Sequence, residues 1–304
     1  MERGSVCRVE SDFEAEPQVQ LHYRIHQPVI PVEVPRNVLL IHGACEHGGR
    51  YQSFLDQAAQ AGWTAIALDL RGHGQSTGNE VHIKRFENYV SDVCAFMEHL
   101  SLNPAHTLLV GCSMGGLIAL RSCQLHWQRT QSSLCRGLGL VSPLLAIRHP
   151  IESWKIVGSK VLNVVRPRTK FRSTLDLNLL SHDEEVVASK RNDPLIRKHV
   201  TARWYWEIQH AMAAAHQEVD SVQLPVMLYQ SGADYVVDPQ ASQAWASRVN
   251  HHHSATPHGR VQFHLLRGWY HEVLNEPQGD VVGSALLEFG EQRLGLKTVQ
   301  RAVS

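Results

Sequence analysis

Short apolar runs alternate along the chain with longer segments whose apolar residues recur at helical spacing. The runs are bounded by turn residues, which is typical of buried strands in a parallel sheet. They lie at 38–41, 64–68, 107–110, 138–141, 225–229 and 261–266, and the helical segments at 51–61, 86–100, 115–127, 240–249 and 281–294. This alternation predicts an α/β fold with a doubly wound, mostly parallel sheet. Residues 5–10 and 18–25 are expected to add an antiparallel hairpin at the start.

The alternation stops between about residues 147 and 222. This region contains no strand-like run, and its apolar residues recur at helical spacing. They include Trp154, Val157, Val161, Leu162 and Val165, followed by Trp204, Trp206 and Ile208. We therefore predict a helical cap over 147–222, inserted between a first part of the core at 1–146 and a second part at 223–304.

Composition and charge narrow the class of protein. With 304 residues, of which 43% are hydrophobic, the chain can bury a sizeable core. Its 29 basic and 29 acidic residues form no long block of like charge, which disfavours nucleic-acid binding and a polybasic membrane anchor. The acidic first residues lack the apolar run of a signal peptide, and no run approaches the roughly 18 apolar residues of a membrane span. We expect a soluble cytoplasmic protein, at most peripheral to the inner face of a membrane.

Neither cysteine nor histidine indicates a metal site. The six cysteines form no C-x-x-C pair and no zinc spacing, so we expect free thiols in a reducing compartment. The cluster His251-His252-His253, with His258 nearby, is the strongest metal candidate. Adjacent side chains point in different directions, however, and no carboxylate or cysteine accompanies them. A solvated loop is favoured, and we predict neither a metal nor an organic cofactor.

The segment Gly111-Cys112-Ser113-Met114-Gly115 lies between a predicted strand and a predicted helix. Strand, sharp turn and helix form the context of a nucleophile elbow, in which a serine stands exposed at the turn. The flanking glycines allow the turn, and the helix N-terminus favours developing negative charge. We predict that Ser113 is a catalytic nucleophile.

A serine hydroxyl is a weak nucleophile at neutral pH and needs a base that an acid orients. In sites of this type the chain order is serine, acid, histidine. Asp234 and Asp238 both follow the strand at 225–229, and Asp234 lies closer to its end. Asp238 precedes Pro239 at a predicted helix start, where an N-cap role is favoured. We therefore choose Asp234 as the acid and His271, which follows the last strand, as the base.

The oxyanion of acyl transfer requires two hydrogen-bond donors, usually backbone N–H groups. One is expected from Met114, the residue after the nucleophile. The loop after the strand at 38–41 supplies the other, and its sequence places Ala44 in that position. Ala44 and Met114 are therefore the predicted oxyanion hole.

Several segments together resemble the monoacylglycerol lipase and bacterial lysophospholipase family of α/β-hydrolases. They are His42-Gly43-Ala44, Glu46-His47, Arg50-Tyr51, 69–76, Ser113–Gly116, Gly232-Ala233-Asp234, Tyr270-His271-Glu272 and, in the cap, Ser181–Asp183 and Arg191–Pro194. The resemblance implies the α/β-hydrolase fold, a Ser113–His271–Asp234 triad and an oxyanion hole from Ala44 and Met114. It also implies an apolar tunnel in the cap for one acyl chain. The expected substrate is a small lipid ester, either a lysophospholipid or a monoacylglycerol.

One position departs from the pattern of that family, and several functions stay open. The residue before the nucleophile is commonly histidine in the family and is Cys112 here. Because Cys112 and Cys45 flank active-site backbone, thiol reagents could inhibit, although packing roles are favoured. The alternatives are a short-chain carboxylesterase, a thioesterase, an aminopeptidase, or a non-catalytic acyl-binding protein. The sequence also leaves open whether the cap tryptophans contact a membrane. It does not determine the head group of the substrate or the oligomeric state.

Overall fold

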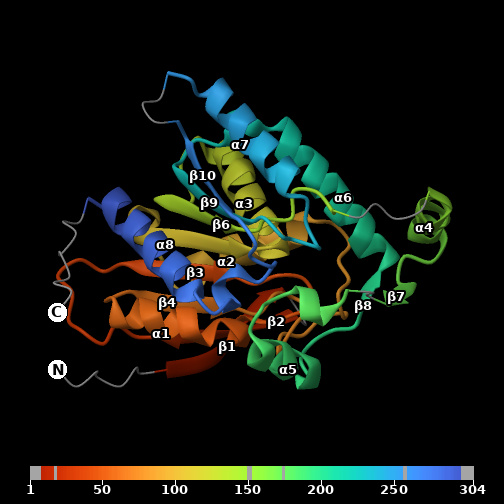
Figure 1. Cartoon of the computed structure of the whole chain (residues 1–304), viewed down its shortest axis with the longest axis horizontal. Helices are drawn as coiled ribbons and strands as arrows, with labels where there is room; N and C mark the ends of the chain where they lie inside the picture. Colours follow the sequence, from red (N-terminus) through yellow and green to blue (C-terminus); the bar gives the residue numbers. More distant parts are fainter. Residues whose placement is uncertain (1–7, 17–18, 149–152, 173–174, 256–258, 296–304) are drawn as a thin grey trace.

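An eight-stranded sheet runs through the centre of the molecule (Figure 1). The computed structural model describes residues 8–16, 19–148, 153–172, 175–255 and 259–295. The strand order is β1-β2-β4-β3-β5-β6-β9-β10. The six strands from β4 to β10 in this order are parallel, and β2 joins β4 in the antiparallel direction. The predicted doubly wound, mostly parallel sheet is confirmed.

The predicted strands are all present. The sheet consists of β1 (Arg8–Glu16), β2 (Val19–His26), β3 (Asn37–Ile41), β4 (Thr64–Leu68), β5 (Thr107–Cys112), β6 (Gly137–Val141), β9 (Val226–Ser231) and β10 (Val261–Leu266). Successive residues of β3 contribute to different cores, since Leu39 packs on one side of the sheet and Leu40 on the other. A strand between two helical layers must be apolar at every position, which explains the uninterrupted runs in the sequence.

Helices cover both faces of this sheet, as Figure 1 shows. α1 (Gln52–Gln60) and α8 (Gly279–Arg293) pack on one face, where Trp63 and Phe289 are among the buried side chains. α2 (Glu87–His99), α3 (Met114–Thr130) and α7 (Pro239–His252) pack on the other, around Phe96 and Trp245. The carboxyl ends of the parallel strands all lie at the same edge of the sheet. Ligands of such folds bind at that edge.

The N-terminal hairpin is confirmed, but its first strand extends beyond the predicted end at residue 10; residues 5–7 of the prediction lie outside the described residues. β1 runs to Glu16 and pairs with β2 over nearly its whole length, with an irregularity between Glu14 and Glu16. Phe13 and Ala15 are partly buried against the core cluster. The apolar residues alternate with acidic ones here, so the acidic character of the segment obscured a strand of period two.

The described residues of the insertion between β6 and β9 contain three α-helices: α4 (Ser153–Val165), α5 (Glu184–Asn192) and α6 (Ala202–Gln217). We refer to residues 147–222 as the cap; its limits remain a prediction. The expectation that this region lacks strands is wrong, because β7 (Lys170–Arg172) and β8 (His199–Thr201) form a small antiparallel pair. Strands of three residues each are too short to produce a recognisable alternation. In the described part of the chain, no helix has the length and apolar character needed to cross a bilayer.

Candidate active site

Ser113 occupies a strained turn between β5 and α3. Its φ is 53° and its ψ is −121°, a conformation that non-glycine residues rarely adopt. Hydrogen bonds hold the turn in place. The N–H of Ser113 donates to the carbonyl of Val141 at 2.9 Å, and its own carbonyl accepts from the N–H of Leu144 at 2.9 Å. The strained conformation therefore fixes the position of the hydroxyl at the carboxyl end of β5.

Two glycines allow the backbone around Ser113 to approach its neighbours closely. A Cβ on Gly111 would lie 2.4 Å from the carbonyl oxygen of Gly115. A Cβ on Gly115 would lie 2.1 Å from the carbonyl oxygen of Ile41, the last residue of β3. Both distances are far below any normal contact. The glycines of the motif are thus required by the packing of the elbow against the neighbouring strand.

The structure brings Ser113, His271 and Asp234 together from three distant segments. His271 Nε2 lies 2.9 Å from Ser113 Oγ, and His271 Nδ1 lies 2.8 Å from Asp234 Oδ2. Asp234 is fully buried, and its Oδ1 accepts from the N–H groups of Val236 at 2.8 Å and Val237 at 3.0 Å. A carboxylate held in this way presents its second oxygen to the imidazole in a fixed direction.

Asp238, the alternative acid, occupies a different role. Its side chain accepts a hydrogen bond from the N–H of Gln240 at 2.9 Å and caps the start of α7. This is the N-cap position that the following proline suggested. The geometry thus supports the choice of Asp234 as the orienting acid.

The charges around His271 make its imidazole a stronger base. Burial lowers the pKa of His271, but the charge of Asp234, the hydrogen bond to it and the carboxylate of Glu272 outweigh that effect. The pKa of His271 is therefore raised from its ordinary value, while the nearby Lys190 acts in the opposite direction. A histidine accepts a proton only in its neutral form, so the acidic limb of an activity profile would follow this pKa.

The two predicted oxyanion donors lie beside the nucleophile. Met114 is the first residue of α3, and the first N–H groups of a helix have no acceptor within it. Gly43 packs against the nucleophile, because a Cβ built on it would lie 3.2 Å from Ser113 Cβ. The N–H of Gly43 donates to Glu46 Oε1 at 2.7 Å, whereas that of Ala44 has no acceptor among the described residues. These contacts support the proposal that Ala44 and Met114 bind an oxyanion.

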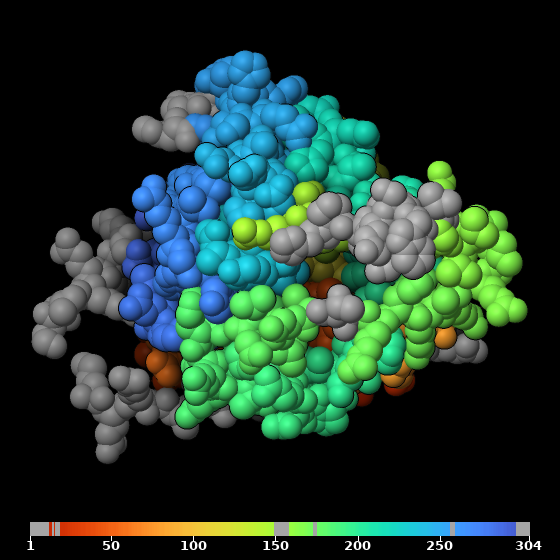
Figure 2. Space-filling model, turned by 45° about the vertical axis from the view of Figure 1, so that its right-hand side comes forward, coloured from red at the N-terminus to blue at the C-terminus, as the bar shows by residue number. Residues whose placement is uncertain are grey.

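A cavity of about 70 Å³ adjoins Ser113 and His271. Part of its wall is apolar, and part is formed by the charged residues Glu46, Lys190 and Glu272. The apolar lining residues are Ala44, Val141, Leu175, Leu180, Val236, Val273 and Leu274. At the surface, Figure 2 shows a depression between the green cap and the blue C-terminal part of the core. The cavity is smaller than the roughly 300–1,000 Å³ of typical ligand pockets, so an acyl tunnel stays a prediction.

Cys112 lines the cavity and is buried, whereas Cys45 is partly buried. Cys112 is 5% exposed, and burial raises the pKa of its thiol well above the ordinary value. Burial also raises the pKa of Cys45 to about 12. Since the thiolate is the reactive form, these environments favour the packing roles over reactivity toward thiol reagents.

The histidine cluster offers no metal site within the described residues. His251 and His252 belong to the last turn of α7, and His258 lies outside the described residues. Over the ranges that the structure describes, no group of three or more histidine, cysteine or acidic side chains could hold a metal ion.

The fold and the elbow together define an α/β-hydrolase, and comparison with known proteins places the chain within that class. A family model described as "Serine aminopeptidase, S33" matches residues 33–278, and the chain belongs to this α/β-hydrolase family. Its relatives include a phospholipase and monoglyceride lipases, so the chain belongs among the lipase and esterase type of hydrolases. The resemblance seen in the sequence is thereby confirmed.

The individual relatives are similar over most of their length. Phospholipase YtpA of Bacillus subtilis is 30% identical over 84% of this chain and 95% of that protein. Monoacylglycerol lipase of Mycolicibacterium smegmatis is 27% identical over 91% of this chain and 95% of its own. The crystal structure of Paleococcus ferrophilus monoacylglycerol lipase superposes with a TM-score of 0.76 at 24% identity, covering 95% of this chain and 99% of that one. The last similarity establishes the fold alone.

Proposed function

We propose that the protein is a serine hydrolase that cleaves a single-chain acyl ester, either a lysophospholipid or a monoacylglycerol. The observation that carries the proposal is the hydrogen-bonded series of Ser113, His271 and Asp234 beside a partly apolar cavity. Relatives named as a phospholipase and as monoacylglycerol lipases support this substrate class.

The proposed mechanism follows from the geometry. His271 takes the proton of Ser113 as Oγ attacks the ester carbonyl, while Asp234 fixes the tautomer of the imidazole and stabilises its charged form. The N–H groups of Ala44 and Met114 bind the oxyanion. His271 then protonates the leaving alcohol. In the second half, His271 takes a proton from water as the water attacks the acyl group. It then gives that proton to Ser113 Oγ, which leaves as the free hydroxyl while the acid is released. The scheme requires no metal ion or organic cofactor.

A substrate panel tests the proposal. The purified protein would be assayed with monoacylglycerols, lysophosphatidylcholine, and nitrophenyl esters from acetyl to palmitoyl. An acyl-CoA thioester and an amino-acid anilide represent the rival activities. We expect the highest kcat/KM on a long single-chain ester. An optimum on the acetyl ester, the thioester or the anilide would contradict the proposal and identify the rival. Failure of a fluorophosphonate probe to label the protein would indicate a non-catalytic acyl-binding protein.

The cap offers one surface for contact with a lipid layer. On α4, Val161, Val164 and Val165 are exposed by 58%, 76% and 69%. Trp204 is buried and donates to Tyr89 Oη at 3.2 Å, so it is not an exposed anchor. The side chain of Trp154 lies outside the described residues. We propose that the exposed valines of α4 contact the lipid surface from which substrate is taken.

Substitution of Val164 and Val165 together by aspartate should weaken binding to phosphatidylcholine–phosphatidylglycerol vesicles by about tenfold or more. Burying a valine side chain contributes about 1.5–3 kcal/mol, and each introduced charge opposes burial further. Co-sedimentation measures the effect, and kcat on a water-soluble ester should not change. Val281 of α8 is 63% exposed on the core, so Val281→Asp is the matched control. Equal sedimentation of all three proteins would contradict the membrane contact.

A further inference from the structure

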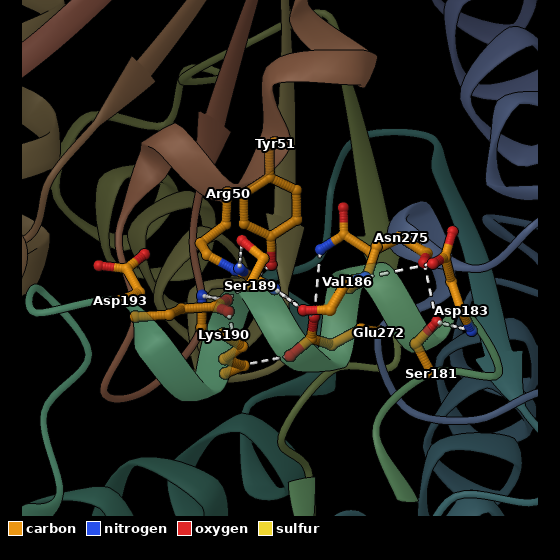
Figure 3. Close-up of polar contacts among 12 residues, drawn as sticks. Arg50, Tyr51, Ser181, Asp183, Val186, Ser189, Lys190, Asp193, Glu272 and Asn275 are labelled. Atoms are coloured by element: carbon orange, nitrogen blue, oxygen red, sulfur yellow. Dashed lines mark hydrogen bonds and ion pairs between the residues drawn. The ribbon is translucent and has the colours of Figure 1, made fainter. Parts of the chain in front are cut away.

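Helix α5 of the cap contacts the two loops that carry the proposed catalytic groups, as the close-up in Figure 3 shows. We define the oxyanion loop as residues 42–50 and the histidine loop as residues 267–276. Lys190 of α5 donates through Nζ to Glu46 of the oxyanion loop at 3.1 Å and also to Glu272 of the histidine loop. The side chains of the three residues are exposed by only 9%, 4% and 5%. The buried ammonium of Lys190 therefore joins both loops, and Nη2 of Arg50 in the oxyanion loop also lies 3.6 Å from Glu272 Oε2.

Each carboxylate continues the connection into its own loop. Glu46 uses its other oxygen, Oε1, to accept from the N–H of Gly43 at 2.7 Å and from Tyr51 Oη at 2.6 Å. Gly43 directly precedes Ala44, so Glu46 sets the direction of the proposed oxyanion donor. Glu272 directly follows His271, and its Oε2 accepts from Asn275 Nδ2 at 3.1 Å. A single carboxylate thus connects the ammonium to the residue before the oxyanion donor, and another connects it to the residue after the base.

Contacts at both ends of α5 fix the helix from which Lys190 extends. Before the helix, the ring of His182 stacks on Tyr270 with centroids 3.8 Å apart, and the backbone N–H of His182 donates to Glu276 Oε2 at 2.8 Å. After the helix, Asp193 accepts from His47 Nε2 at 2.8 Å. The first pair of contacts reaches the histidine loop and the last reaches the oxyanion loop. The helix is therefore held to the histidine loop at one end and to the oxyanion loop at the other.

The charge of Lys190 is permanent in this site. Burial lowers its pKa, but the carboxylates of Glu272 and Glu46 outweigh burial and raise the pKa above the ordinary value. Lys190 therefore does not release a proton at the pH of catalysis. Buried ion pairs of this kind contribute little net stability, because desolvation offsets much of their attraction. Removal of one partner, in contrast, leaves an uncompensated buried charge and disturbs the local geometry.

We propose that Lys190 is a positioning residue, which holds the oxyanion loop and the histidine loop at the separation that acyl transfer requires. Through Glu46 it sets the donor at Ala44, and through Glu272 it sets the base at His271. The inference rests on the proposed function, since it concerns the same site. Preorganised donors must lie where the oxyanion forms, and displacement by about 1 Å can cost a factor of roughly 100 in rate.

Lys190→Met tests the proposal. We expect kcat on a soluble nitrophenyl ester to fall by about 10–100-fold, with KM changed by less than about threefold. Lys190→Arg retains the cation and should restore part of the rate. Lys198 is an exposed lysine of the cap, so Lys198→Met is the matched control and should retain wild-type kcat.

The pH profile separates positioning near the base from simple stabilisation of the cap. The charged groups that face His271 are Asp234 after β9, Glu272 in its own loop and Lys190 on α5. Because Lys190 lowers the pKa of His271, its loss should move the acidic limb of kcat/KM to higher pH. In the double variant Lys190→Met/Glu272→Gln the limb should return toward the wild-type position. The value of kcat should stay low, because the connection through Lys190 is still missing.

Three results would overturn the proposal. The first is a folded Lys190→Met protein with wild-type kcat and an unmoved acidic limb. The second is a loss confined to the melting temperature, which would indicate a role in stability alone. If Lys190→Met does not fold, the double variant is measured instead, because it leaves one fewer unpaired charge. Wild-type kcat in the double variant is the third result. A wild-type protein that hydrolyses no ester and resists a fluorophosphonate would instead reject the proposed function, and the inference with it.

Discussion

Replacement of Ser113 by alanine should lower kcat on a long-chain ester by about 10⁴–10⁶-fold. The variant lacks the Oγ that forms the acyl-enzyme, so His271, 2.9 Å from that atom in the wild type, has no proton to accept. A residual rate from the oxyanion donors and substrate binding should remain above that in water. Ester hydrolysis and covalent labelling by a fluorophosphonate measure the loss.

The fold of this variant should be preserved. Alanine tolerates the φ of 53° no worse than serine does, and the backbone bonds of residue 113 to Val141 and Leu144 remain. Ser122 provides the control, since it is a buried serine of α3 whose Oγ donates to the carbonyl of Ile118 at 2.8 Å. Ser122→Ala should keep kcat close to that of wild type. Labelling of the Ser113→Ala protein at the wild-type rate would show that another residue is the nucleophile.

The order of the core and the proposed triad could be predicted because their signals are local. β3 and β4 lie between two helical layers, so nearly every residue of each run is buried and apolar. Ser113 lies between such a strand and a helix. The glycines two residues before and two residues after it indicate that the backbone packs closely there. Asp234 and Asp238 differ in their distance from the end of β9, and that difference is also visible in the sequence.

The bridge formed by Lys190 could not be predicted, because its partners are distant. The sequence of α5 is rich in charged residues and indicates a solvated helix. Lysine is almost never buried unless it is paired, and the partners Glu46 and Glu272 are 144 and 82 positions away. Both acids appeared in the sequence only as parts of a family resemblance. Their common cation emerges once the cap is folded over the two loops.

Asp234→Asn should lower kcat by about 10⁴-fold while leaving the fold intact. The amide has nearly the shape of the carboxylate, but it no longer stabilises the imidazolium or fixes the tautomer in which Nδ1 carries the proton. The charge of Asp234 also raises the pKa of His271, so its removal should move the acidic limb of the residual activity to lower pH. Rate measurements from pH 4 to 9 test both effects.

Asp238→Asn is the matched control for this change, because asparagine caps a helix about as well as aspartate does. The variant should therefore retain kcat within about a factor of two, with little change in the free energy of unfolding. If Asp238→Asn lost the activity and Asp234→Asn kept it, the roles of the two acids would be exchanged. That outcome would require His271 to leave the partner 2.8 Å away and contact the residue that now caps α7. The buried position of Asp234 and its two backbone donors argue against such a movement.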